Sequence, residues 1–392
     1  MRRSPLTIVY LTVFIDLLGL GIILPVLPFY AQSFGASGFA VGATLALYSA
    51  MQLVSSPLLG AFSDRVGRRP VLLASLAGSA ISLALTGLAG SLPVLLLARA
   101  LSGLFGGSIG TAQAYVADVT PPAERARAMG LIGAMTGLGF IFGPALGASL
   151  SQFGLGTAAF VAAGLAAGNF LLAWFFLPES RPAGVAPRRP VFAFLRVGEA
   201  LAHPAVGRLF GAMFLAMFAF AGVQATFPLL GAQNFALTAS SLGVVFVTVG
   251  LVSVLMQGLL VGRLTKRFGE RTLALIGLGV FVVTLLTLPL VHSLTEALAV
   301  LALQSVGSAL YNPALTSLIS REAPPDEKGS LLGLGQAFGA LSRATGPFVA
   351  GFLYDYGSAL PFLVGALLVA IGIAVLVRLP APADVLAPQP AD

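Results

Sequence analysis

Long stretches of continuously apolar residues are the feature that most limits the folds open to this chain. Residues 12–30, TVFIDLLGLGIILPVLPFY, contain a single charged residue, Asp16. About 20 apolar residues are what an α-helix needs to cross the hydrocarbon core of a bilayer. With 57% hydrophobic and 9% charged residues, the chain also lacks the polar surface to cover a water-soluble protein. We therefore predict an integral membrane protein.

Twelve such runs, bounded by charged or turn residues, are predicted to be transmembrane helices. They are apolar throughout instead of alternating, and each is about twice the length of a membrane β-strand, which excludes a β-barrel. The predicted fold class is therefore an all-α membrane protein. The predicted spans are 6–30, 40–62, 70–90, 92–117, 126–152, 156–178, 204–231, 239–263, 271–291, 294–320, 327–353 and 357–379.

The basic residues fall on one side of the predicted membrane. Of the 21 Lys and Arg residues, only Arg99 and Arg343 lie far from the ends of a predicted span, and the other 19 lie at or close to every second span boundary. This is the positive-inside pattern, which predicts that both termini are cytoplasmic and that the protein is integral to the cytoplasmic (inner) membrane. It also accounts for the net charge of +7 without a nucleic-acid partner.

The chain repeats itself after about 200 residues. The segment GAFSDRVGRR at 60–69 aligns with GRLTKRFGER at 262–271, and PPAER at 121–125 aligns with PPDEK at 324–328. Further along, Gly143-Pro144 aligns with Gly346-Pro347 in the same comparison. These matches indicate a duplicated unit of six spans.

A parallel repeat of this kind predicts two pseudo-symmetric six-helix bundles that rock about a site near the middle of the membrane. The predicted bundles are 1–178 and 204–392. Residues 179–203 are predicted to form a cytoplasmic linker, in which 191–202 form either an amphipathic helix on the membrane surface or plain linker.

The loop between the second and third spans carries a specific motif. GAFSDRVGRRP at 60–70 resembles the G-x-x-x-D-R-x-G-R-R signature of the major facilitator superfamily, and the resemblance extends over all twelve spans. A generic basic loop would require neither Asp64 nor a glycine at both turns. The resemblance implies that Arg68 pairs with Asp118, and that Asp64 faces the electropositive start of span 11 when the inner gate is shut. The residues assigned to this gating motif are Gly60, Asp64, Arg65, Gly67, Arg68, Arg69 and Asp118.

Span 5 resembles the family's antiporter motif G-x-x-x-G-P-x-x-G-G. The matching residues are Gly139, Gly143, Pro144 and Gly147, while Ala148 replaces the last glycine. From spacing alone, glycines four residues apart form a smooth stripe for close helix packing. The resemblance adds an implication of export, because importers of this family usually lack the motif.

A carboxylate in the middle of span 1 requires a reason to be there. A charged Asp at the bilayer centre costs about 2.5–3.5 kcal/mol, so Asp16 must be paired, wetted by a cavity or protonated part of the time. The segment around Asp16 resembles the first span of the tetracycline and multidrug:proton antiporters, which implies that Asp16 carries the coupled proton. The alternative is a structural Asp that hydrogen-bonds neighbouring helices. Arg99 in span 4 either tunes Asp16 through its charge or extends to the outer headgroups.

Other polar residues within the spans are candidates for lining a substrate cavity. Arg343 either pairs with Asp16, binds an anionic substrate or packs at the interface between the bundles. Tetracycline exporters carry an acid in span 3 where this chain has Ser82, which argues against the tetracycline-magnesium complex as the substrate. The remaining cavity candidates, each of which can instead bond a neighbouring helix, are Gln113, Gln224, Gln257, Gln304, Tyr311, Asn312 and Gln336.

The resemblance implies a drug:proton antiporter that exports lipophilic or amphiphilic small molecules. The alternative on the same scaffold is an uncoupled or proton-linked transporter of a metabolite such as a sugar or an organic anion. The expected partners are the substrate, protons and the lipid bilayer, and a monomer is expected. With 2 His and 0 Cys, no catalytic set or metal site can be assembled, so we expect neither an enzyme nor a cofactor.

Overall fold

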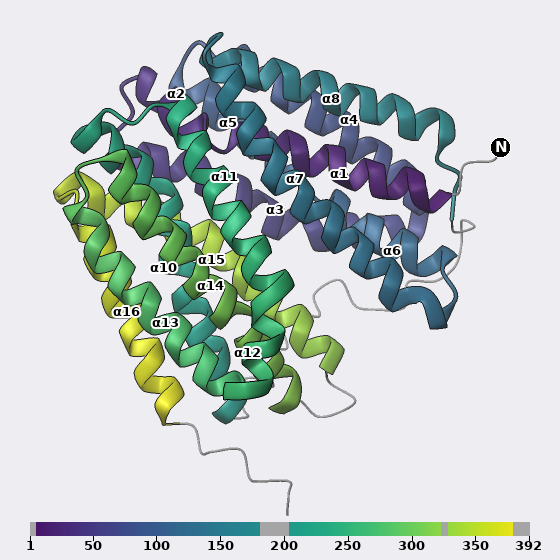
Figure 1. Cartoon of the computed structure of the whole chain (residues 1–392). Helices are drawn as coiled ribbons and strands as arrows, with labels where there is room; N and C mark the ends of the chain where they lie inside the picture. The colour runs from purple at the N-terminus through teal and green to yellow at the C-terminus, as the bar shows by residue number, and fades with distance from the viewer. Residues whose placement is uncertain (1–4, 181–203, 323–327, 379–392) are drawn as a thin grey trace, which may run out of the picture.

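The computed structural model describes residues 5–180, 204–322 and 328–378, and every regular element in these ranges is a helix (Figure 1). Each of the twelve predicted spans coincides with one helix or with consecutive helices. Eleven are long and apolar enough to cross a membrane within the described ranges, and α15 is a twelfth helix of similar length (Lys328–Tyr356). The all-α fold class is confirmed. Apart from its first two residues, the predicted linker 179–203, including 191–202, lies outside the described residues.

The N-terminal half contains two spans that are broken, although we predicted them to be continuous. Span 1 divides around Pro25, and span 4 divides at Gly106-Gly107, because these residue types weaken helix continuity. The elements of this half are α1 (Pro5–Ile23), α2 (Leu27–Ser33), α3 (Gly38–Val66), α4 (Arg68–Gly87), α5 (Leu92–Phe105), α6 (Ser108–Val119), η1 (Pro122–Glu124), α7 (Arg125–Ser151) and α8 (Leu155–Phe176).

The C-terminal half follows the same order, with one irregularity in span 8. A π-helical turn, η3, separates α11 from α12, and such turns occur frequently at functional sites. The elements of this half are α10 (Pro204–Phe235), α11 (Ala239–Leu255), η3 (Met256–Leu260), α12 (Val261–Phe268), α13 (Glu270–Thr287), η4 (Leu288–Leu290), α14 (Leu294–Glu322), α15 and α16 (Leu360–Val377).

The buried side chains form clusters that separate the two halves. One large cluster takes all its fully buried members from residues 206–376. Two others take theirs from residues 8–177, with Leu229 as the one addition. This distribution agrees with the predicted bundles, whose exact limits remain a prediction.

Two helix pairs join the halves, and they occupy equivalent places in the repeat. The pair α3 and α15 makes the most extensive contact of any two helices, and α7 packs on α11. A methyl group added to Gly42 would collide with the Pro347 carbonyl, and one added to Gly243 would collide with the Ala148 side chain. Small residues therefore allow a close approach of the helices at both pairs.

The glycine stripe of span 5 packs within the N-terminal half. A methyl group added to Gly139 would lie 2.7 Å from Leu17 Cβ, and one added to Gly143 would lie 2.6 Å from Gly21 Cα. The stripe therefore packs against α1, together with the Pro144 ring, while Ala148 of the same helix faces α11. The packing expected from the glycine spacing is thus present between α1 and α7.

The two halves meet at one end of the molecule and diverge at the other. We call the end that carries Arg68 and Arg271 the basic end, and the end at which α3 and α11 begin the opposite end. At the basic end of α3, Leu58 is 47% and Phe62 is 56% exposed. Figure 1 shows the two groups of helices spreading apart toward α6 and α12. The helices of the two halves therefore lie farther apart at the basic end than at the opposite end.

Replacing Gly143 with Val should lower the thermal unfolding midpoint of the detergent-solubilised protein. The added side chain overlaps Gly21, and overpacking of this kind costs about 1–3 kcal/mol. Gly137 is a matched control on the same helix, because nothing lies within 4 Å of a methyl group added there. Equal losses for Gly143→Val and Gly137→Val would contradict the proposed packing.

Candidate functional site

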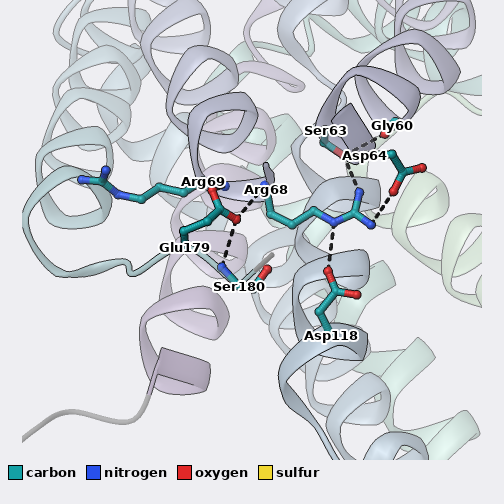
Figure 2. Close-up of polar contacts among 8 residues, drawn as sticks. All are labelled: Gly60, Ser63, Asp64, Arg68, Arg69, Asp118, Glu179 and Ser180. Atoms are coloured by element: carbon teal, nitrogen blue, oxygen red, sulfur yellow. Dashed lines mark hydrogen bonds and ion pairs between the residues drawn. The ribbon is translucent and has the colours of Figure 1, made fainter. Parts of the chain in front are cut away.

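The gating motif forms a compact ionic network at the basic end (Figure 2). The Arg68 guanidinium contacts Asp64 at 2.6 Å and Asp118 at 3.0 Å, and it donates to Ser63 Oγ at 2.6 Å. Arg68 is only 6% exposed, so the paired carboxylates compensate for its loss of water. The pair between Arg68 and Asp118 that the family resemblance implies is therefore present in the structure.

The turn before α4 is held in place by Glu179, which follows the end of α8. Gly67 has φ 106°, in the region that favours glycine, and a methyl group there would collide with the Glu179 carboxylate. That carboxylate accepts hydrogen bonds from the backbone N–H groups of Arg68 and Arg69 at 2.9 and 3.1 Å. Because Glu179 sits at the electropositive start of α4, it anchors the turn that positions Arg68.

The expected contact of Asp64 with the start of span 11 stays a prediction. The Asp64 carboxylate forms an ion pair with Arg68 of the same half. The side chains of residues 328–330, at the start of α15, lie outside the described set.

The C-terminal half repeats the central ion pair with its charges exchanged. In the repeat, Glu270 takes the place of Arg68 and Arg321 takes the place of Asp118. Arg321 Nη1 lies 3.1 Å from Glu270 Oε2, and Ser317 donates to the same carboxylate at 2.5 Å. The repeat therefore preserves the position of the ion pair but not the sign of each partner.

A second polar cluster lies deep in the N-terminal half. Asp16 on α1 accepts a hydrogen bond of 2.5 Å from Ser108, the first residue of α6. The break at Gly106-Gly107 places this helix start within the membrane span. A helix N-terminus is electropositive, so α6 stabilises a negative charge on Asp16.

Arg99 faces the protein interior and not the outer headgroups. It is 1% exposed, and its guanidinium lies 4.7 Å from the centre of the Tyr48 ring on α3. The alternative in which Arg99 extends to the outer headgroups is therefore wrong. Its Nε atom has no hydrogen-bond partner within the described part of the chain, so the Tyr48 ring is its main neighbour there.

Tyr48 connects the charged residues of both halves. Asp16, Arg99 and Arg343 all lie within electrostatic range of its hydroxyl. Gln52 donates to that hydroxyl at 3.2 Å and to the Gly106 carbonyl at 2.7 Å, which ties Tyr48 to the break in span 4. One carboxylate and two guanidiniums therefore surround a single tyrosine.

Arg343 belongs to the C-terminal half but lies near this cluster. It is exposed although it sits in the middle of α15, and across the described ranges its guanidinium has neither a hydrogen bond nor an ion pair. Direct pairing of Arg343 with Asp16, one of the three alternatives, is therefore absent from this conformation. An unpaired guanidinium in a span favours contact with water or with a ligand.

The remaining cavity candidates divide into exposed and buried residues. Gln304 is 4% and Tyr311 is 2% exposed, and the Tyr311 ring stacks on Phe281 at 5.9 Å. Both lie on the face of α14 that packs into the core of this conformation, and their assignment to the cavity stays a prediction. Residues on the exposed side of their helices are Gln113, Gln224, Gln257, Asn312, Gln336 and Arg343.

A polar cleft of about 560 Å³ occurs in the C-terminal half. One wall is a row of residues four apart on α14, and the other is Gln257 on the π-helical turn. Amide and hydroxyl groups on its walls offer uncharged hydrogen bonds to a ligand. The lining residues are Gln257, Ser308, Asn312, Pro313, Thr316, Ser317 and Ser320.

The sequence alone did not reveal Tyr48, Ser108 or Glu179. Tyr48 and Ser108 are ordinary residues within apolar spans, and only the break in span 4 brings Ser108 onto Asp16. The ion pair with exchanged charges could have been predicted from the sequence, because aligning the two halves places Glu270 at the position of Arg68.

Comparison with known proteins connects these features to one family. The family model described as Major Facilitator Superfamily matches residues 9–257 and 209–391. The chain is 32% identical to the class C tetracycline resistance protein of Escherichia coli, over 93% of this chain and 94% of that protein. It is 30% identical to multidrug resistance protein 1 of Bacillus subtilis (strain 168), over 97% of this chain and 98% of that protein.

Solved structures share the same fold. The human organic anion transporter MFSD10 (TETRAN) superimposes with a TM-score of 0.68 at 29% identity, covering 95% of this chain and 98% of that one. A bacterial homolog of the human lysosomal transporter Spinster superimposes with a TM-score of 0.76 at 16% identity, covering 96% of both chains. The second likeness concerns the fold alone.

Exchanging the charges of the N-terminal network should be tolerated only if the whole set changes together. Arg68→Glu or Asp118→Arg alone places like charges in contact and should lower the thermal unfolding midpoint. The triple variant Asp64→Lys/Arg68→Glu/Asp118→Arg copies the charges of Lys266, Glu270 and Arg321 and should regain most of the loss. We expect an interaction energy of about 0.5–3 kcal/mol. A triple variant no more stable than the single variants would contradict the equivalence of the two networks.

Proposed function

Because this chain belongs to the major facilitator superfamily, we propose that it exports lipophilic or amphiphilic small molecules in exchange for protons by alternating access. It is an integral membrane transporter and not an enzyme. Transporters of this family carry small-molecule substrates. The proton coupling, the direction of transport, the cytoplasmic membrane as its location and a monomeric state belong to the proposal.

The observation that carries the proposal is the position of Asp16. It is the one acid in the middle of any predicted span, and it lies against the start of a half-helix. A carboxylate placed there can hold its charge on the N-terminus of α6 or lose that charge by binding a proton. We assign Asp16 as the proton carrier, and Arg99 acts on it through Tyr48.

The proposed cycle uses the two ends of the molecule in turn. With the basic end in the cytoplasm, the structure is assigned to the inward-open state of this cycle, in which substrate enters and Asp16 releases its proton. The halves then rock about the cavity and open the opposite end. Substrate leaves there, and a proton binds Asp16 before the return. Inward proton movement also gains about 2.3 kcal/mol per charge per 100 mV of membrane potential.

Asp16→Asn should abolish proton-driven export while leaving downhill exchange of substrate. An amide cannot bind and release the coupled proton, so a pH difference would no longer drive accumulation. The measurement is uptake of a lipophilic fluorescent dye into inverted proteoliposomes under an imposed pH gradient. Ser108→Ala is the control, because it removes the hydrogen bond but keeps the acid. Gradient-driven accumulation by Asp16→Asn would refute the assignment.

A second candidate function, transport of an organic anion, is favoured by Arg343. This exposed guanidinium has no partner among the described side chains, and the nearby Tyr48 hydroxyl accepts from Gln52 but keeps its own proton to donate. Together they offer donors from both halves to a carboxylate or sulfonate. The name of the human relative, an organic anion transporter, agrees with this possibility.

The charge of the substrate also determines how protons influence its binding. Protonation of Asp16 leaves the cluster with two positive charges and no negative one. An anion then binds more tightly as the pH falls, while a cation binds less tightly. Antiport requires competition between proton and substrate, so the pH dependence of binding separates the two candidates.

Arg343→Gln should weaken binding of an anionic amphiphile about tenfold to a hundredfold, because a charged hydrogen bond is worth about 1.5–3 kcal/mol. The measurement compares a fluorescent fatty acid with its methyl ester on the purified transporter. The ester should bind equally to both proteins, and Arg343→Lys should keep part of the affinity for the acid. Equal losses for acid and ester would remove the anion candidate.

A further inference from the structure

A carboxylate from one half caps a helix of the other half at the opposite end. Asp355, near the end of α15, accepts a hydrogen bond of 2.6 Å from the backbone N–H of Gly38 and one of 2.9 Å from that of Phe39. These N–H groups belong to the first turn of α3. Gly38 and Asp355 are 317 positions apart in sequence.

The first three N–H groups of α3 have acceptors only when both halves contribute. Ser37 is the N-cap, and its hydroxyl accepts from Ala40 at 3.3 Å. The Asp355 carboxylate accepts from the other two N–H groups, those of Gly38 and Phe39. A helix start carries unsatisfied donors and a partial positive charge, which makes a carboxylate the strongest available cap. If the halves separate at this end, α3 loses two of its three acceptors to water.

The equivalent helix start in the other half does not depend on its neighbour. α11 begins with a capping box in which Thr238 accepts from the Ser241 N–H at 3.2 Å and Ser241 accepts from the Thr238 N–H at 2.9 Å. At the repeat position of Asp355 the chain carries Gln152, which has no charge. The cap from the other half is therefore a feature of one helix pair and not of the repeat.

The contacts around Asp355 close this end of the molecule tightly. The Phe39 ring lies 4.6 Å from the ring of Phe348 and 6.4 Å from that of Phe352. A methyl group added to Gly38 would lie 2.8 Å from the Asp355 carboxylate and 2.8 Å from the Gly351 carbonyl. Any opening between α3 and α15 at this end therefore breaks the cap.

We propose that Asp355 is a positioning residue that holds the opposite end shut while the basic end is open. The cap joins the halves in this conformation and is released when they rock. This inference rests on the alternating access of the proposed function, but its test measures distance instead of transport.

The experiment measures the separation of the halves at the opposite end. The chain has 0 Cys, so Ser33→Cys and Thr295→Cys introduce one spin label in each half for double electron–electron resonance. Asp355→Asn should increase the population in which the halves are separated at the opposite end about threefold to tenfold, because it removes a charged cap. Asp355→Glu keeps the charge and should recover part of the closed population.

Two further variants distinguish the cap from general damage to the fold. Gly38→Ala leaves the acid in place but forces α3 and α15 apart, so it should shift the distances at least as far as Asp355→Asn. Thr238→Ala removes the internal cap of α11 and should lower thermal stability without shifting the distances. An unchanged distribution in Asp355→Asn, or an equal shift in Thr238→Ala, would overturn the proposal. If the variants shift the distances as expected but the unsubstituted protein shows no proton-driven export, the result counts against the proposed function and not against the cap.

Discussion

Close approach of helix backbones is the interaction on which this structure depends. Lipid tails are as apolar as leucine, so helices in a bilayer gain little from burying apolar side chains and associate through tight packing instead. α7 uses this principle on two faces. Its glycines pack against α1 within one half, while Ala148 packs against Gly243 of the other half. Because the same helix packs closely both within its own half and against the other half, it carries an extended row of small residues.

The duplicated halves agree in geometry and differ in charge. The ion pair at the basic end is Arg68 with Asp118 in one half and Arg321 with Glu270 in the other. Attraction between opposite charges is the same whichever partner carries which sign, so the repeat constrains where the pair lies and leaves its polarity open. At the opposite end the halves differ more strongly, because α11 caps itself and α3 relies on Asp355. Pseudo-symmetry therefore describes the backbone better than it describes the ionic contacts.

Hydropathy and the motifs predicted the spans, the repeat and the contact between Arg68 and Asp118. They did not predict which face of each helix is buried, and the burial of Gln304 and Tyr311 on α14 is known only from the structure. In a water-soluble protein polar residues mark the outer face of a helix, but here lipid makes that face apolar as well. Tyr48 and Asp355 were missed for a related reason. Their roles depend on partners supplied by remote segments, and nothing in the local sequence distinguishes them from ordinary span and helix-end residues.

The helices α3 and α15 connect the cap at the opposite end, the charged cluster around Tyr48 and the ionic network at the basic end. Along α3, Phe39 lies at the cap of the opposite end, Tyr48 lies in the charged cluster and Asp64 lies in the ionic network of the basic end. Along α15, Arg343 faces the cluster and Asp355 forms the cap. A helix is stiff over this length, so a change of charge beside Tyr48 that draws Arg343 closer or repels it acts on both ends of the pair together. The proposed coupling between a proton and the two ends would then require no relay of side chains, because a rigid element with two arrangements is sufficient.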